Sequence, residues 1–209
     1  MKPRIAVIDG GTYYHHRALF GERYRSYFAE VIYIRDLWNT PLAHFDAVVF
    51  PDRLHPGPLV AARRQIAEYL DTGGTVAAFG ESQSHTWLPG LAWSPRPTNF
   101  WWWKTPGARL PLYAATPEHS LFRHLTIHEA TWHVHGVFTP PSGTTPLIGL
   151  EGDGALLYED TVTTPGRMVI SSLDPFYHYG SYFMPVTERF LHGFLEWLAA
   201  SCSGPRASP

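Results

Sequence analysis

Residues 73–87 have the sequence GGTVAAFGESQSHTW, which predicts a helix end, a short buried strand and a sharp turn. Its leading glycine pair can end a helix, because glycine adopts positive φ at no steric cost. Residues 75–79 are apolar without polar alternation, which is typical of a strand covered by helices on both faces. Gly80 then permits a sharp turn that exposes the polar residues 81–84. In open α/β folds, ligands and catalytic groups lie at such turns.

The rest of the first half predicts the same architecture. Apolar residues recur at helical spacing over residues 14–28, and a second helix is expected from about residue 58 to the glycine pair. Further strands are predicted at residues 4–9, 31–34 and 45–50. Strands that alternate with helices in this order indicate a mostly parallel sheet with right-handed crossovers.

The second half has a different pattern. Residues 88–117 are rich in proline and tryptophan, and we expect an insertion there that covers the sheet or forms a lid. A hairpin turn is predicted at residues 151–154, because glycine alternates with acidic residues between two apolar runs. The other expected elements are strands at residues 131–138, 146–151, 155–161 and 167–173, a helix at about 185–200 and a flexible tail at 201–209. We therefore predict a single domain over residues 1–200.

Composition limits the classes of function. The chain has 209 residues with 44% hydrophobic and 15% aromatic residues, as expected of a globular domain. A formal charge of −2 gives no electrostatic reason to expect nucleic acid or a membrane surface as a partner. The single cysteine, Cys202, excludes a disulfide framework. The apolar run at residues 5–8 is too short for a signal peptide, so we expect a cytoplasmic protein. We also expect no cofactor.

Four stretches in this order resemble the class I glutamine amidotransferase-like superfamily, in particular its divergent ThuA-like branch. They are residues 5–14 (IAVIDGGTYY), 45–50 (FDAVVF), 73–80 (GGTVAAFG) and 168–179 (MVISSLDPFYHY). They look like the first strand and turn, the strand before the oxyanion loop, the strand before the nucleophile elbow, and the strand that supplies the catalytic histidine. The resemblance implies a flavodoxin-like three-layer α/β/α sandwich with a mostly parallel central sheet and a Trp/Pro-rich insertion.

The same comparison indicates that the residues required for glutamine hydrolysis are replaced in this chain. Glutamine hydrolysis requires a thiolate, a base and oxyanion donors. The family's elbow cysteine would fall near Gly80, and no neighbouring residue is a cysteine. Its oxyanion glycines would fall at Pro51 and Asp52, and proline has no N–H to donate. Its His-Pro-Glu motif would fall at residues 174–176, which are Asp-Pro-Phe. We therefore expect no glutaminase activity.

Two alternative sets of catalytic residues remain. Ser82 lies in a GESQS sequence that approximates a serine elbow, and His178 with Asp174 could supply its base and orienting acid. The alternative is that Ser82 only makes local hydrogen bonds. Glu81 could instead transfer protons in a pair with Asp9 or Asp174, since crowded carboxylates raise one another's pKa. The alternative is that the two aspartates fix their turns.

Histidine and tryptophan suggest two further hypotheses. His133 and His135 alternate along a predicted strand and would face the same side, where they could chelate zinc, although no third ligand follows from spacing. We predict no metal, with this pair as the alternative. The tryptophans at residues 101–103 cannot all point inward from an extended segment, so some would be exposed as a lid or an interface.

The favoured hypothesis is a domain that recognises a small polar ligand at the carboxyl ends of the strands. The tryptophans and the ThuA-like resemblance favour a carbohydrate. The alternatives are a hydrolase that uses Ser82 or Glu81 with His178, and a non-catalytic assembly subunit that forms homo-oligomers. The expected site residues are Asp9, Gly10, Gly11, Gly80, Glu81, Ser82, Asp174, His178 and Tyr179, beneath an insertion that contributes Trp102.

Overall fold

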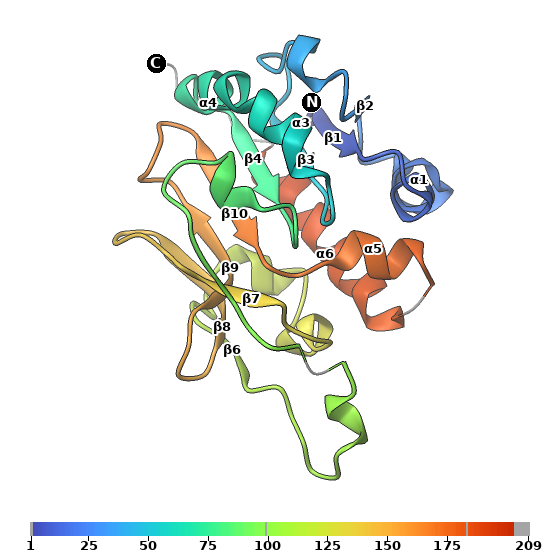
Figure 1. Cartoon of the computed structure of the whole chain (residues 1–209), viewed down its shortest axis with the longest axis vertical. Helices are drawn as coiled ribbons and strands as arrows, with labels where there is room; N and C mark the ends of the chain where they lie inside the picture. The colour runs from blue at the N-terminus through green and yellow to red at the C-terminus, as the bar shows by residue number, and fades with distance from the viewer. Residues whose placement is uncertain (1, 99, 183, 203–209) are drawn as a thin grey trace.

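A computed structural model describes residues 2–98, 100–182 and 184–202, and its centre is a parallel sheet (Figure 1). The parallel strands are β1 (Ile5–Asp9), β2 (Glu30–Tyr33), β3 (Ala47–Phe50), β4 (Thr75–Ala78) and β10 (Arg167–Ser171). They lie in the order β2-β1-β3-β4-β10. This is the flavodoxin-like order, in which the second strand is outermost and the first and third are neighbours. The predicted fold class is confirmed.

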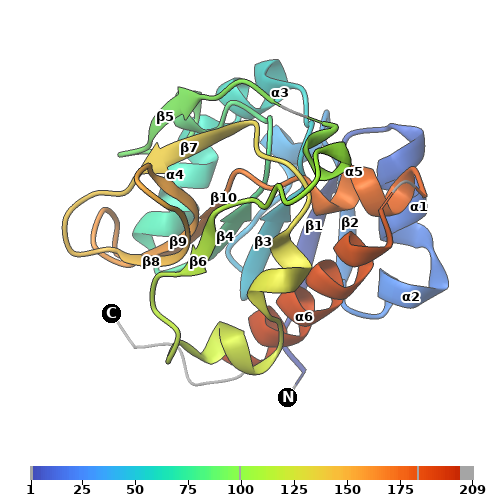
Figure 2. The same cartoon turned by 90° about the horizontal axis from the view of Figure 1, so that it is seen from below.

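Helices cover both faces of this sheet, because its strands are apolar on both sides. In β1, Ile5 and Val7 belong to one core cluster and Ala6 and Ile8 to the other. The first cluster packs against α1 (Tyr13–Phe20), α2 (Glu22–Arg25), α5 (Pro175–Gly180) and α6 (Pro185–Ser201). The second packs against α3 (Pro56–Ala61) and α4 (Arg63–Asp71). Figure 2 shows the sheet between these two layers of helices.

Several helix boundaries differ from the predicted ones. The helix expected at residues 14–28 is two helices that meet at Gly21, whose ψ of 146° is extended. The second predicted helix is likewise divided, at Ala62, and it begins at Pro56. The last helix ends one residue later than expected, at Ser201. Residues 203–209 of the predicted tail lie outside the described residues.

Antiparallel strands extend the sheet beyond β10. They are β5 (Ala92–Pro95), β6 (Leu112–Ala114), β7 (Gly136–Thr139), β8 (Thr145–Leu150) and β9 (Ala155–Asp160). β9 pairs with β10, β7 and β8, while β5 pairs with β7 and β6 with β8. The predicted hairpin between β8 and β9 is confirmed. The segment 88–117 therefore adds two strands, β5 and β6, to this end of the sheet, and Figure 2 labels both of them.

Two predicted strands are shorter than expected. The strand expected at residues 131–138 begins only at Gly136, so His133 and His135 precede it. The strand expected at residues 167–173 ends at Ser171. The residues just before β7 and the residues just after β10 therefore belong to loops. Both loops lie near the carboxyl edge of the parallel sheet, where the polar residues described below are found.

Gly80 fixes the turn after β4 at this carboxyl edge. Its φ is +55°, and a Cβ atom there would lie 2.4 Å from the Asp52 Cβ atom. No side chain fits such a distance, so glycine lets the loop after β4 approach the loop after β3. Among the described residues, no helix has the length and apolar character needed to cross a membrane.

Candidate functional site

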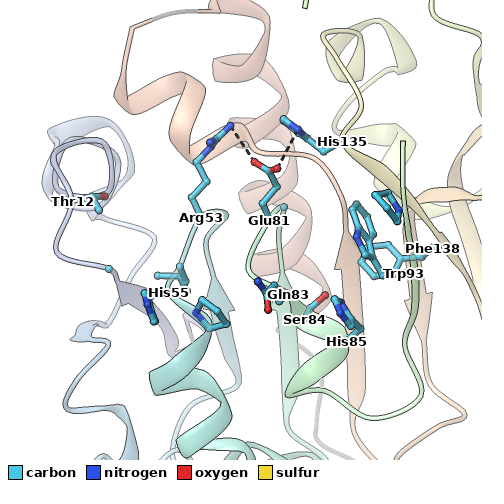
Figure 3. A pocket seen from close by; sticks show the side chains of 15 residues that line it. Thr12, Arg53, His55, Glu81, Gln83, Ser84, His85, Trp93, His135 and Phe138 are labelled. Carbon is cyan, nitrogen blue, oxygen red and sulfur yellow. Dashed lines mark ion pairs between the residues drawn. The ribbon is translucent and has the colours of Figure 1, made fainter. Parts of the chain in front are cut away.

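A cavity of about 700 Å³ opens at the carboxyl edge of the parallel strands (Figure 3). The loops after β1, β3 and β4 form one side of it, and β5 and β7 with the segment before β7 form the other. The position agrees with the general rule for open α/β sheets, in which ligands bind outside the carboxyl ends of strands where the strand order reverses. Its lining includes Gly10, Thr12, Arg53, His55, Gly80, Glu81, His85, Trp93, His135 and Phe138.

Glu81 lies at the centre of the polar side of this cavity. Its Oε2 atom is 3.3 Å from Nη2 of Arg53, and its Oε1 atom is 3.3 Å from Nδ1 of His135. Figure 3 shows both ion pairs above the loop that follows β4. The Glu81 side chain is 40% exposed, so a molecule in the cavity can reach its carboxylate.

Arg53 connects this cavity to the interior. Its φ of +58° lies in the left-handed region, where a residue with a side chain is strained, and such residues concentrate at functional sites. The Nη2 atom also donates to Oδ2 of Asp174 at 3.1 Å. The guanidinium carbon lies 3.9 Å from the ring centroid of Tyr177, in a cation–π contact. These contacts hold the guanidinium between two carboxylates.

Asp174 is the buried centre of a histidine cluster. The Oδ2 atom is 3.3 Å from Nε2 of His135, and the Oδ1 atom is 3.3 Å from Nε2 of His178. Nε2 of His133 lies 3.0 Å from Nε2 of His135 and 3.2 Å from Nε2 of His178. The indole Nε1 of Trp132 donates to Oδ1 of Asp174 at 3.0 Å. Three imidazoles therefore face one carboxylate.

Electrostatics favour an ionised carboxylate at Asp174. Burial alone would raise the pKa of Asp174, but the imidazoles of His133, His135 and His178 hold this pKa well below its usual range. Burial lowers the pKa of His133 below 6.5 despite the nearby carboxylate. A neutral imidazole beside an ionised carboxylate presents lone pairs on both groups, and lone pairs are what a cation or a donor requires.

Asp52 caps the helix α5 in place of Asp174, which leaves the Asp174 carboxylate free to face the histidines. Asp174 is the N-cap residue of α5, yet its side chain makes no cap hydrogen bond. The Asp52 carboxylate accepts the N–H groups of Phe176 at 2.8 Å and Tyr177 at 2.9 Å instead. Burial and the nearby Asp174 carboxylate raise the pKa of Asp52 well above its usual range. The first turn of α5 is thus satisfied from the loop after β3, and the Asp174 carboxylate turns toward the histidines.

The structure does not bring Ser82 to the cavity. Ser82 is fully buried, and its hydroxyl donates to the Phe79 carbonyl oxygen at 3.2 Å. Its own carbonyl accepts from Nε1 of Trp87 at 2.9 Å. This local bonding matches the alternative to a serine nucleophile. Glu81 contacts Arg53 and His135, whereas His178 contacts Oδ1 of Asp174 and Nε2 of His133.

The remaining predicted site residues lie in different places. Asp9 accepts the Gly11 N–H at 2.8 Å and so fixes its own turn. Gly10 and Gly80 line the main cavity. Tyr179 packs on another tyrosine and borders a separate cavity on the face covered by α5 and α6. Trp102 is half-buried, and its indole N–H donates to the Trp132 carbonyl oxygen.

Sequence reasoning missed several of these residues. Arg53 lies in the loop that follows the third strand, which ends at Phe50, and its position near a carboxyl end was an available signal. Trp132 had no such signal, because a tryptophan in an apolar segment is expected in the core. His133 and His135 were singled out on a false premise, since they do not lie on a strand. Their imidazoles converge because the segment that precedes β7 crosses the carboxyl edge beside Asp174.

Comparison with known proteins identifies the class of fold. A ThuA-like protein from Bacteroides uniformis is 12% identical over 93% of this chain and 90% of that protein, with a TM-score of 0.59. A GMP synthase component from Thermoplasma acidophilum is 10% identical over 96% of both chains, with a TM-score of 0.59. A glutamine amidotransferase from Thermotoga maritima is 13% identical over 99% of this chain and 88% of that protein, with a TM-score of 0.54.

These similarities confirm the predicted resemblance at the level of fold. The chain has the glutamine amidotransferase-like fold, and a ThuA-like protein is among its structural neighbours. No protein-family profile matches the chain, and no curated protein matches it. Because one fold can host many functions, the function depends on the chemistry of the site itself.

Proposed function

We propose that this protein binds a small polyhydroxylated ligand, a carbohydrate, in the cavity that Glu81, Arg53 and His135 line, and that it does not hydrolyse glutamine. The proposal rests on the contacts of the Glu81 carboxylate with Arg53 and His135 inside a cavity of about 700 Å³. Cavities of about 300–1,000 Å³ hold small molecules in proteins. Charged groups of this kind make the stronger hydrogen bonds to ligand hydroxyls.

The opposite wall of the cavity supports a sugar as the ligand class. Trp93 and Phe138 lie there with their ring centroids 5.0 Å apart. Trp93 is only partly buried, and Figure 3 shows both rings across the cavity from Glu81. A flat aromatic face opposite charged hydrogen-bonding groups suits a molecule with an apolar ring face and a hydroxylated edge. Trp93 takes the role that the sequence hypothesis gave to Trp102.

The position of the cysteine supports the absence of glutaminase chemistry. The single cysteine of the chain, Cys202, follows α6 and packs against the core. Burial raises the pKa of its thiol, and its polar neighbours include Thr75 at the start of β4. The start of β4 is at the opposite edge of the sheet from Gly80. A thiol in this position does not face the cavity, and its raised pKa disfavours the thiolate.

Isothermal titration of the full chain against a panel of mono- and disaccharides and sugar phosphates tests the proposal. We expect at least one member of the panel to bind. Glu81→Gln should then weaken that binding about 10–100-fold, because a hydrogen bond to a charged group contributes about 1.5–3 kcal/mol. Trp93→Ala should weaken it as well, while Trp93→Phe should retain most of the affinity.

Glu68→Gln is the matched control. Glu68 is an exposed carboxylate on α4 that pairs with Arg64, and it does not line the cavity. Its loss should leave the dissociation constant unchanged. The absence of heat across the whole panel, or equal effects of the Glu81 and Glu68 substitutions, would contradict the proposal.

A further inference from the structure

The histidine cluster beside the cavity is the second polar feature of this edge, and carbohydrate binding does not explain it. Its four side chains are almost completely buried: the exposed fractions are 0% for Asp174, 2% for His133, 2% for His178 and 9% for His135. Buried polar groups usually satisfy one another or hold a ligand. In this cluster, three imidazole nitrogens are directed at one carboxylate.

Three ligand atoms, one each from His133, His135 and Asp174, lie close enough together to hold one metal ion, and His178 adjoins this group. The Nε2 atoms are 3.0 Å apart for His133 and His135 and 3.2 Å apart for His133 and His178. The distances from Asp174 oxygens are 3.3 Å to His135, 3.3 Å to His178 and 3.8 Å to His133. Zinc bonds of about 2.0–2.2 Å in tetrahedral geometry require ligand atoms roughly 3.3–3.6 Å apart. Small side-chain adjustments would bring Nε2 of His133, Nε2 of His135 and Oδ2 of Asp174 to that separation.

The surroundings of the cluster match those of metal ligands. Metal-binding histidines usually donate a hydrogen bond from their other ring nitrogen to a carboxylate, a backbone carbonyl or water. This bond fixes the tautomer and orients the ring. His135 does so: its Nδ1 atom is 3.3 Å from Oε1 of Glu81, and its Nε2 atom faces the cluster. The carboxylate of Asp174 is oriented in turn by Trp132 at 3.0 Å and Arg53 at 3.1 Å.

A route from solvent to the cluster is also present. A second cavity of about 660 Å³ has His133 and His178 in its wall. Phe100, Trp101 and Trp103 from the segment between β5 and β6 border the same cavity. An ion at the cluster would therefore be accessible from this side, while His135 faces the main cavity.

We propose that His133, His135 and Asp174 bind one divalent transition-metal ion, that His178 or a water molecule completes its coordination, and that this ion is zinc. Imidazole nitrogen with a carboxylate is a donor set for zinc, whereas calcium and magnesium prefer sites made of oxygen alone. The structure supplies Asp174 as the third ligand, which could not be named from the spacing of His133 and His135. This inference does not depend on the nature of the ligand in the main cavity.

Zinc titration of the metal-free full chain tests this inference. Chain dialysed against a chelator is titrated with Zn²⁺ by calorimetry, and Co²⁺ is added separately to record its visible spectrum. We expect one zinc per chain, a raised melting temperature and the absorption of tetrahedral Co²⁺. His133→Gln and Asp174→Asn should each lower the zinc affinity more than about 100-fold, and Glu81→Gln should lower it about 10–100-fold.

His85→Gln is the matched control, because His85 lines the main cavity but lies outside the cluster. It should bind zinc as the wild type does. Circular dichroism identifies variants that fail to fold, and for these the decision rests on the Glu81 variant and the wild-type cobalt spectrum. A folded wild-type chain without stoichiometric zinc, or folded cluster variants with unchanged affinity, would overturn the inference. Neither result would affect the carbohydrate proposal, because the metal titration contains no carbohydrate.

Discussion

Replacing Gly80 with alanine tests the close approach of two loops on which the whole site depends. Gly80 has a φ of +55°, and its new Cβ atom would lie 2.4 Å from the Asp52 Cβ atom and 3.3 Å from that of Asp174. The left-handed backbone costs a residue with a side chain roughly 1–2 kcal/mol. The overlap adds about 1–3 kcal/mol, as typical of overpacking. We therefore expect a loss of about 2–5 kcal/mol in the free energy of unfolding.

Gly73→Ala separates the two contributions. Gly73 also has a positive φ, +82°, but a Cβ atom there would meet no other atom within 4 Å. Its substitution should cost only the backbone strain of roughly 1–2 kcal/mol. Urea denaturation of both variants measures the difference, which we expect to be about 1–3 kcal/mol. A Gly80 variant as stable as the Gly73 variant would refute the close contact between the loops after β3 and β4.

Three further predictions concern the rest of the molecule. Burial lowers the pKa of His15 below 6.5. As the pH falls, His15 therefore becomes protonated at a higher pH in the unfolded chain than in the folded protein. The free energy of unfolding should therefore decrease as pH falls below about 6.5, and less steeply in His15→Gln; an unchanged slope in denaturant titrations would contradict this. The hydroxyl of Tyr69 accepts the Thr75 N–H at 3.2 Å, so Tyr69→Phe should cost about 1–3 kcal/mol in thermal unfolding, and a neutral effect would argue against that buried bond. Trp101 and Trp103 are 57% and 56% exposed, so their double substitution by alanine should change stability by less than about 0.5 kcal/mol. Light scattering of the same variant tests the homo-oligomer hypothesis, which an unchanged mass would count against.

The fold could be predicted because its strands have strong local signals. Residues 75–78 are buried on both faces, as their uninterrupted apolar sequence indicates, and the same holds for β3. The breaks within the two predicted helices were not visible, since they depend on how each half packs against the sheet. The antiparallel strands β5 and β6 were hidden in a proline-rich segment because they depend on pairing with distant residues.

The site was predictable in position but only partly in membership. Gly80 and Glu81 follow a central strand, so the rule for carboxyl ends predicts their position, and both line the cavity. Ser82 is one residue further, and there the chain direction turns the side chain into the core. The partnership of Asp174 with His133 joins residues far apart in the sequence and depends on Asp52 as the cap of α5. No local sequence pattern indicates that Asp52, rather than the N-cap residue Asp174, accepts the first N–H groups of α5.

We propose that this chain, which has the glutamine amidotransferase-like fold, uses the carboxyl edge of its sheet for something other than amide hydrolysis. The most direct measurement is ammonia release from glutamine by the purified full chain, with the Cys202→Ser variant beside it. We expect no release above the buffer blank from either protein. Release by the wild type that disappears in the variant would contradict the claim, as would release by both.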